Sequence, residues 1–99
     1  MIHILVNYKV KKDKVNIVKK AIKEFIDTVK KNEPGTHYYG AYQLDDKVSF
    51  LHFMTFEDEK AKRIHETSSY VKKFVEVLYT NCTKKPVFTD LSLIKSNRH

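Results

Sequence analysis

The 99-residue sequence has one cysteine, two glycines and two prolines, and it lacks a long hydrophobic run. The single cysteine, Cys82, excludes an intrachain disulfide and fits a reducing compartment, so the expected location is the cytoplasm. No apolar stretch approaches the roughly 18 residues that a membrane span needs. The N-terminus has neither the basic lead nor the cleavage site of a signal peptide. We therefore expect one globular domain without a membrane partner.

Common catalytic and metal motifs are also missing. The sequence contains no glycine-rich phosphate loop, no CxxC or HExxH and no GxSxG, so the enzyme classes that carry these motifs have no support. A metal site would require several of the five histidines to meet carboxylates. His52 and His65 are the two histidines expected to lie near each other, and no carboxylate clearly joins them. No metal site is expected.

What the sequence does contain is a regular succession of hydrophobic patterns. Apolar residues recur at helical spacing between Val15 and Asn32, and Pro34-Gly35 ends that helix. Asp58 can cap a second helix, which breaks at Thr67–Ser69 and resumes through Leu78. The remaining segments alternate as strands do. The expected elements are strands at 2–10, 36–44, 48–56 and 87–94 and helices at 15–32, 59–66 and 69–78.

This order, β-α-β-β-α-β, is that of an α+β ferredoxin-like sandwich. One sheet face lies under the helices, and the other would expose Leu5, Leu51 and Phe53. Beside them the 36–44 strand would place either His37 and Tyr39 or, in the opposite phase, a similar number of apolar side chains. A large apolar patch marks an interface, and twofold symmetry is the default. We therefore expect a homodimer whose sheets meet to form a dimeric α/β barrel, with a pocket between sheet and helices in each protomer. The single domain is expected to span 1–95, with a frayed tail at 96–99.

Basic residues are concentrated near the N-terminus. Residues 1–32 hold nine lysines and three acidic residues, so +6 of the net charge of +7 lies there. Such a helix can attract nucleic acid or an anionic substrate, although a solvated lysine-rich face gives the same composition. RNA binding by this topology needs an aromatic pattern with a glycine and a basic residue in the third strand. The strand at 48–56 has neither, so no nucleic-acid partner is expected.

His65 is the strongest catalytic candidate, as a general base or a hydrogen-bond partner of the substrate. The alternative is a histidine bonded to backbone at the end of a helix. Asn7 is unusual among the apolar residues of its strand and is either a ligand-orienting amide or a satisfied structural one. Aromatic side chains are numerous enough to line a pocket for a planar organic molecule, or to be plain core or dimer contacts. The expected pocket residues are His52, Phe56, Tyr39, Tyr42, Tyr70 and Phe74.

Four segments together resemble the antibiotic biosynthesis monooxygenase family, in its quinol-monooxygenase branch. They are the run Glu33-Pro34-Gly35-Thr36-His37-Tyr38-Tyr39, the strand that ends at Phe56, the Asp58-Glu59-x-Ala61-x-x-x-His65 helix and the segment 69–74. The resemblance implies a small dimeric barrel that oxidises an aromatic polyketide or quinol with O₂, without metal, flavin or haem. A deprotonated substrate would give an electron directly to oxygen, and the protein would supply a dry pocket and a proton acceptor.

The chain departs from this pattern at two positions. Phe56 stands where the family usually has tryptophan, and Met54 stands where glutamate is common. Asn7 matches an asparagine of haem-degrading relatives, but these relatives also need a tryptophan at position 56 and a histidine where Leu78 stands, so haem degradation is not expected. Two alternatives to a monooxygenase remain. The His65-Glu66-Thr67 run resembles a branch that isomerises a phosphorylated autoinducer sugar, and a non-catalytic module could bind a hydrophobic ligand.

Overall fold

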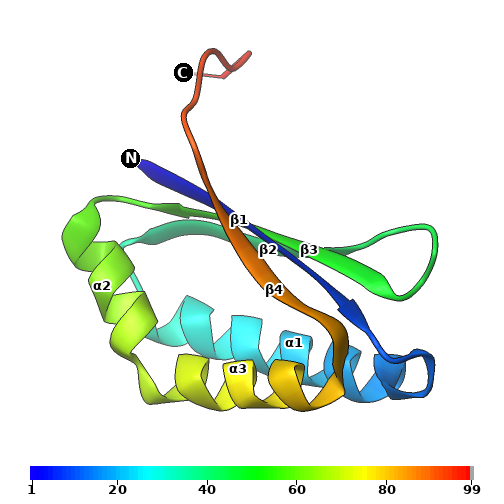
Figure 1. Ribbon diagram of the computed structural model, residues 1–99. Coiled ribbons are helices and arrows are strands. Elements are labelled where there is room, and N and C mark those ends of the chain that lie inside the picture. The colour runs from blue at the N-terminus through cyan, green and yellow to red at the C-terminus, as the bar shows by residue number, and fades with distance from the viewer. Residues whose placement is uncertain (99) are drawn as a thin grey trace.

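The computed structural model describes residues 1–98 and shows one four-stranded antiparallel sheet with helices on one of its faces (Figure 1). The strands follow the order β2-β3-β1-β4. This arrangement confirms the α+β ferredoxin-like fold. The elements are β1 (Ile2–Val10), η1 (Lys12–Lys14), α1 (Val15–Asn32), β2 (Thr36–Gln43), β3 (Ser49–Phe56), α2 (Glu59–Thr67), α3 (Ser69–Asn81) and β4 (Cys82–Leu91).

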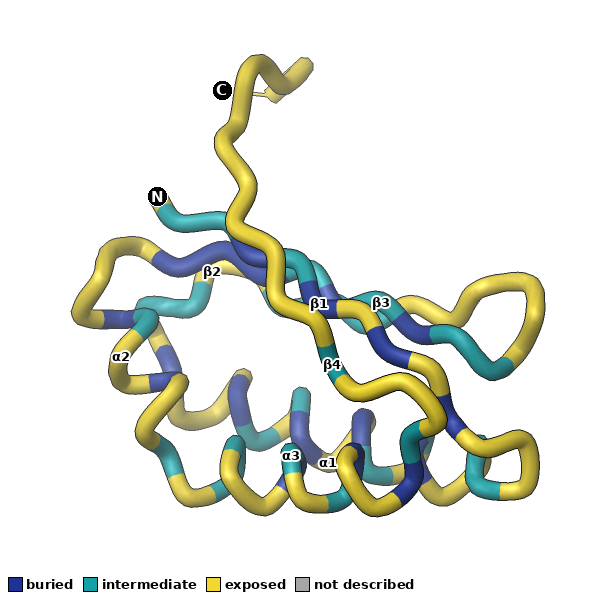
Figure 2. The backbone as a smooth tube through the Cα atoms, viewed as in Figure 1, coloured by how far each residue is buried: buried dark blue, intermediate teal, exposed yellow. Residues whose placement is uncertain are grey.

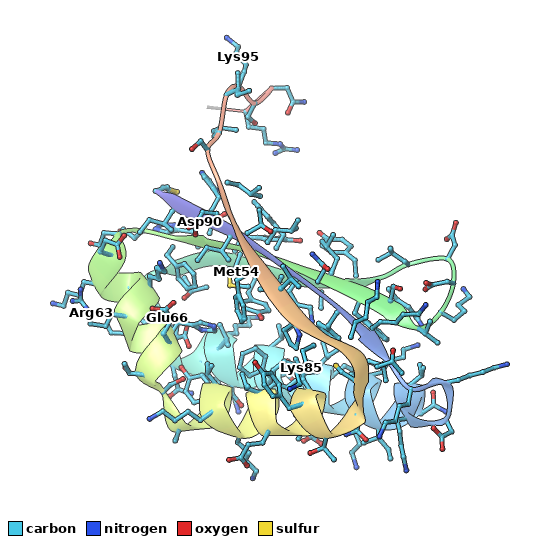
Figure 3. All side chains as sticks on the ribbon, in the orientation of Figure 1. Met54, Arg63, Glu66, Lys85, Asp90 and Lys95 are labelled. Carbon is cyan, nitrogen blue, oxygen red and sulfur yellow. The ribbon has the colours of Figure 1, made fainter. Side chains whose placement is uncertain are left out.

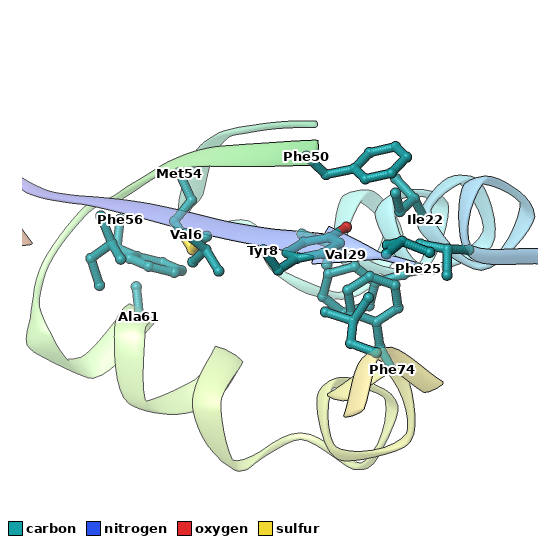
Figure 4. Packing of buried hydrophobic residues seen from close by; sticks show 14 residues of the cluster. Val6, Tyr8, Ile22, Phe25, Val29, Phe50, Met54, Phe56, Ala61 and Phe74 are labelled. Atoms are coloured by element: carbon teal, nitrogen blue, oxygen red, sulfur yellow. The ribbon is translucent and has the colours of Figure 1, made fainter. Parts of the chain in front are cut away.

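The core lies between the sheet and the paired helices α1 and α3. Helix α1 buries Val18, Ile22, Phe25 and Val29, which recur every three or four residues and so form one stripe. Phe25 stacks on Phe74 of α3, with ring centroids 4.3 Å apart (Figure 4). Each fully buried side chain of this kind stabilises the fold by about 1.5–3 kcal/mol. This packing fixes both helices against the sheet.

Helix α2 lies across one end of the sheet, and its position depends on a capping carboxylate and a glycine. Asp58 caps the helix as expected, because its Oδ1 accepts from the backbone N–H of Ala61 at 2.9 Å. A Cβ atom on Gly35 would lie 2.7 Å from the Cβ of Ala61, so only glycine permits this approach. The N–H of Glu57 also donates to the carbonyl of Gly35 at 2.8 Å. The start of α2 is thereby held against the loop that follows α1.

Strand β4 differs from the prediction at both ends. It begins at Cys82 rather than Val87, because helix α3 continues to Asn81 and Cys82 already pairs with Val10. Pro86 lies inside the strand. It is tolerated there because β4 is an edge strand, where a missing N–H need not interrupt a ladder. The strand ends at Leu91, short of the expected 94.

The face of the sheet away from the helices carries apolar side chains. The strand register places Leu5, Leu51, Phe53 and Val87 on this outer face. Strand β4 is exposed along almost its whole length (Figure 2). A register shift between Thr36 and Tyr38 sets the phase of β2. The outer face is therefore an uncovered apolar surface, as the sequence predicted.

Two remaining expectations concern the limits of the chain. The single domain over 1–95 stays a prediction, and the expected tail at 96–99 includes His99, which lies outside the described residues. Within residues 1–98, no helix combines the length and the apolar character required to cross a membrane.

Candidate functional site

A cavity of about 240 Å³ lies under the sheet, between β1, β3, α2 and α3. Met54 and Phe56 of β3 form its wall together with Phe74 and Leu78 of α3. Glu66 lies on the side of α2 that faces this space, below the sheet that carries Met54 (Figure 3). The walls are mainly hydrophobic. The polar side chains that reach them are His52, His65, Tyr39, Glu66 and Tyr79.

His65 is held by a buried carboxylate that the sequence did not suggest. Its Nδ1 lies 2.9 Å from Oε1 and 3.0 Å from Oε2 of Glu33, and the two side chains are only 8% and 2% exposed. The hydroxyl of Thr36 donates to the same carboxylate at 2.6 Å, and the hydroxyl of Tyr70 donates to Oε2. These four residues come from α2, the loop after α1, β2 and α3. The carboxylate therefore ties four segments together around one histidine.

Electrostatics keep this carboxylate charged. Burial alone would raise the pKa of Glu33, but hydrogen bonds from His65, Thr36 and Tyr70 outweigh it and hold the pKa below its ordinary value of 4.5. For Tyr70, burial and the hydrogen bond to the carboxylate raise the pKa to about 12. Tyr70 therefore stays protonated and serves as a donor to Glu33.

The ionised carboxylate fixes the orientation of the imidazole. Because Glu33 can only accept, Nδ1 of His65 must carry the hydrogen, and Nε2 bears the free lone pair whenever the ring is neutral. Within residues 1–98, Nε2 has no hydrogen-bond partner. Every fully buried side-chain nitrogen or oxygen in these residues does have a partner, so Nε2 is not fully buried. It follows that Nε2 is accessible at the cavity that His65 lines. This arrangement can accept a proton from a bound molecule.

A second histidine in the same wall has the opposite environment. His52 is 1% exposed, and its Nε2 and Nδ1 lie 2.8 Å and 2.9 Å from the hydroxyls of Tyr8 and Tyr39. Burial lowers the pKa of His52 to about 4, so the ring is neutral near pH 7. Both nitrogens are already occupied by tyrosines. His52 is therefore a fixed part of the wall.

The structure brings most of the predicted pocket residues together. His65, His52, Phe56, Tyr39 and Phe74 all line the cavity. Tyr70 lies behind the wall and reaches the site through Glu33.

Two predicted site residues lie elsewhere. Tyr42 is 51% exposed, and its hydroxyl meets that of Tyr38, because the shift in β2 turns both side chains to the outer face. Asn7 pairs with Leu51 and Val87 on that face, since its neighbours in β1 point to the core. Within one chain, Asn7 therefore does not line the cavity that His65 lines. The depression that Asn7 does line is a separate one.

The functional residue that sequence reasoning missed is Glu33. Its signal was an acidic residue just after the C-terminal end of α1, where the helix dipole disfavours negative charge. Such a position calls for a specific partner. We expected no carboxylate beside the two central histidines. For His65 this expectation was wrong, because Glu33 is hydrogen-bonded to it. Within residues 1–98, no three His, Cys, Asp or Glu side chains are grouped to hold a metal ion.

Comparison with known proteins agrees with this fold. The structure is similar to a crystal structure described as an antibiotic biosynthesis monooxygenase, with a TM-score of 0.87 and 14% identity, over 96% of this chain and 100% of the other. It is also similar to a candidate antibiotic biosynthesis monooxygenase from Nitrosomonas europaea (TM-score 0.85, 18% identity, 96% and 100% covered). A conserved protein from Methanosarcina mazei Go1 follows (TM-score 0.83, 22% identity, 91% and 89% covered).

At these identities the solved structures establish the fold alone, and no curated protein matches the sequence. The sequence itself supplies the stronger link. The family model described as antibiotic biosynthesis monooxygenase matches residues 1–77, most of the chain, including β1, the Glu33 loop and the His65 helix. The chain belongs to the antibiotic biosynthesis monooxygenase family.

Proposed function

We propose that the protein is a cofactor-independent monooxygenase that oxidises a small aromatic or quinol-like molecule with O₂. The observation that carries this proposal is the Glu33–His65 pair, which presents a free imidazole Nε2 to a mainly apolar cavity. His65 removes a proton from an acidic O–H or C–H of the substrate. The electron-rich anion gives one electron to O₂, and the resulting radical and superoxide combine into a peroxide anion, which takes back the proton from His65. Loss of water, which removes the remaining hydrogen of the oxygenated carbon, then leaves a carbonyl, so one oxygen atom enters the product and the other leaves as water.

The size of the cavity restricts the substrate. A cavity of about 150 Å³ can hold benzene, and this one measures about 240 Å³. It therefore suits a substituted single ring or a compact two-ring molecule. Mainly hydrophobic walls exclude water and so protect a reactive anion from premature protonation.

The alternative of a phosphorylated sugar is less well supported. Of the described residues that line the cavity, none is a lysine or arginine, and both Glu66 at the wall and Glu33 behind it would repel a phosphate. Simple binding of a hydrophobic ligand without catalysis remains the second candidate, because the apolar cavity supports it equally well. Oxygen consumption separates this candidate from the monooxygenase.

Incubation with a panel of quinols and anthrones tests the reaction. In air we expect O₂ uptake to match the amount of carbonyl product formed, and under nitrogen we expect no product. With labelled O₂, one labelled oxygen atom should enter each product molecule. Protein stripped by a chelator should retain its rate. Equal turnover with and without O₂ would contradict the proposal, and binding without turnover across the panel would favour the non-catalytic module.

We also propose that the protein acts as a cytoplasmic homodimer, with a second copy covering the outer face of the sheet. The unpaired thiol of Cys82 suits a reducing compartment. On the outer face the register places two lysines, Lys9 and Lys84, opposite each other, whereas the row of Leu5, Phe53 and Thr89 holds no charged side chain. Two copies can therefore meet over this row with little of the repulsion that a net charge of +7 would otherwise produce. A twofold interface then pairs the patch with itself.

Sedimentation should give about twice the chain mass of 11.7 kDa. Phe53→Asp places a charge in the proposed interface and should shift the protein to monomer at micromolar concentration. Ile17→Asp is the matched control, because Ile17 is 53% exposed on α1, away from the outer face. A native monomer, or a dimer unaffected by Phe53→Asp, would contradict this assembly.

A further inference from the structure

A chain of three hydrogen-bonding side chains runs from the core to the cavity wall. Tyr8 of β1, His52 of β3 and Tyr39 of β2 are joined at 2.8 Å and 2.9 Å. Burial raises the pKa of both tyrosines and lowers that of the histidine, so all three groups are neutral near pH 7. A neutral imidazole has one donor and one acceptor nitrogen. The two hydrogen bonds through His52 can therefore run in one of two directions, from Tyr8 toward Tyr39 or the reverse.

One difference between the two tyrosines decides between these directions: Tyr39 lines the cavity, whereas Tyr8 does not. Tyr8 is 3% exposed, and within residues 1–98 its hydroxyl has no hydrogen-bond partner other than His52. If His52 donated from Nε2, the hydroxyl hydrogen of Tyr8 would be buried without an acceptor, which is unfavourable. The preferred direction is therefore from Tyr8 to Nε2. Nδ1 of His52 then carries the hydrogen and donates to the oxygen of Tyr39.

This direction leaves the hydroxyl hydrogen of Tyr39 unused. Tyr39 lines the cavity, and its ring centroid lies 5.6 Å from that of His65. We propose that Tyr39 donates a hydrogen bond to the substrate oxygen on which negative charge develops, and that Tyr8 and His52 are positioning residues that hold Tyr39 in the donor orientation. The proposal rests on the proposed function, since it places the anion next to the proton acceptor His65.

The donor is well matched to this role. Burial and then the nearby charge of Glu33 raise the pKa of Tyr39, so its hydroxyl keeps its hydrogen over the working pH range. A preorganised donor in a water-poor cavity stabilises an oxyanion more strongly than water does. The other ionisable groups around the anion are His65 with Glu33 behind it, His52, Glu66 and Tyr79. None of these is altered when only the hydroxyl of Tyr39 is removed.

Binding of 4-nitrophenol tests the donor without requiring turnover, because the colour of the bound phenol reports its ionisation. We expect Tyr39→Phe to raise the pKa of the bound phenol by about one to two units, which corresponds to roughly 10- to 100-fold weaker phenolate binding. Tyr42→Phe, the matched loss of an outer-face hydroxyl, should change nothing. An unchanged pKa in Tyr39→Phe, or no binding of nitrophenol to the native protein, would overturn the proposal.

¹⁵N NMR of protein with ¹⁵N-labelled histidine reports the tautomer of His52, and so tests the direction of the hydrogen bonds from Tyr8 to Tyr39 in the native protein. We expect the Nδ1–H form of His52, and a mixture of both forms in Tyr8→Phe. A native Nε2–H form would overturn the proposal, because Tyr39 would then donate to His52. The two proposals fail separately. O₂-dependent turnover with an unchanged Tyr39→Phe variant refutes the donor alone, whereas a phenol pKa shift without O₂ uptake refutes the monooxygenase alone.

Discussion

Replacement of His65 by glutamine is expected to lower kcat/KM for O₂-dependent oxidation by roughly 10²- to 10⁴-fold, the usual contribution of a general base. Glutamine can still donate to the Glu33 carboxylate from its amide, so the buried hydrogen bond that Nδ1 makes at 2.9 Å has a substitute. What the variant loses is the lone pair of Nε2 at the cavity. Initial rates of O₂ uptake at saturating and limiting substrate measure the effect.

Two observations distinguish a chemical role of His65 from a structural one. The fall should lie mainly in kcat, because an interaction made in the transition state affects kcat and kcat/KM together. His37→Gln is the matched control: His37 has a side chain 42% exposed and contacts Glu57. A His65→Gln variant that keeps the native melting temperature and the native rate would show that the proton acceptor is another group.

The sequence predicted the elements that local patterns determine. Asp58 begins α2 because a carboxylate meets free N–H groups, and the stripe of Ala61 and His65 faces inward because the two residues are four apart. Strand alternation likewise placed His52 and Phe56 on the inner face. These features depend on neighbours in the chain, so they are visible without a structure.

Contacts between distant segments were not visible in the sequence. Glu33 and His65 are 32 positions apart, and nothing in their local patterns links them. Tyr39 and Tyr42 are three positions apart in β2, so alternation alone puts them on opposite faces of the sheet. Which of the two faces the cavity depends on the register, because the shift between Thr36 and Tyr38 moves each later residue of β2 to the other face. Asn7 fails as a site residue for a different reason: alternation along β1 does not show which face of the sheet covers the cavity, and Asn7 lies on the face away from it.

The two cavity histidines are suited to different roles because their surroundings differ. His65 has a charged carboxylate behind it, 2.9 Å from its Nδ1. Two neutral hydroxyls around His52 offer no such charge, and burial lowers its pKa to about 4. His65 can move a proton, whereas His52 can only orient one.

Removal of the Glu33 side chain is expected to have the largest effect on stability. Glu33→Ala leaves three partners, His65, Thr36 and Tyr70, facing a buried space without an acceptor. Breaking a buried pair in this way costs about 3–5 kcal/mol, and we expect a fall of that size in the free energy of unfolding. Urea titration at pH 7 measures it. Glu24→Ala, an exposed glutamate of α1, should change the stability by no more than about 0.5 kcal/mol.

Acid provides a sharper test of the same carboxylate, with Glu33→Gln as the variant. The pKa of Glu33 is lower in the folded chain than its ordinary value of 4.5, so its charged form stabilises the native state fully above pH 4.5. This contribution is lost as pH falls through the folded pKa, where both states become protonated. Glutamine cannot titrate. The gap in unfolding free energy between native protein and Glu33→Gln should therefore narrow as the pH falls below about 4.5. A gap that stays constant with pH would show that Glu33 stabilises the fold by shape and neutral hydrogen bonds, and that its charge does not hold His65 in place.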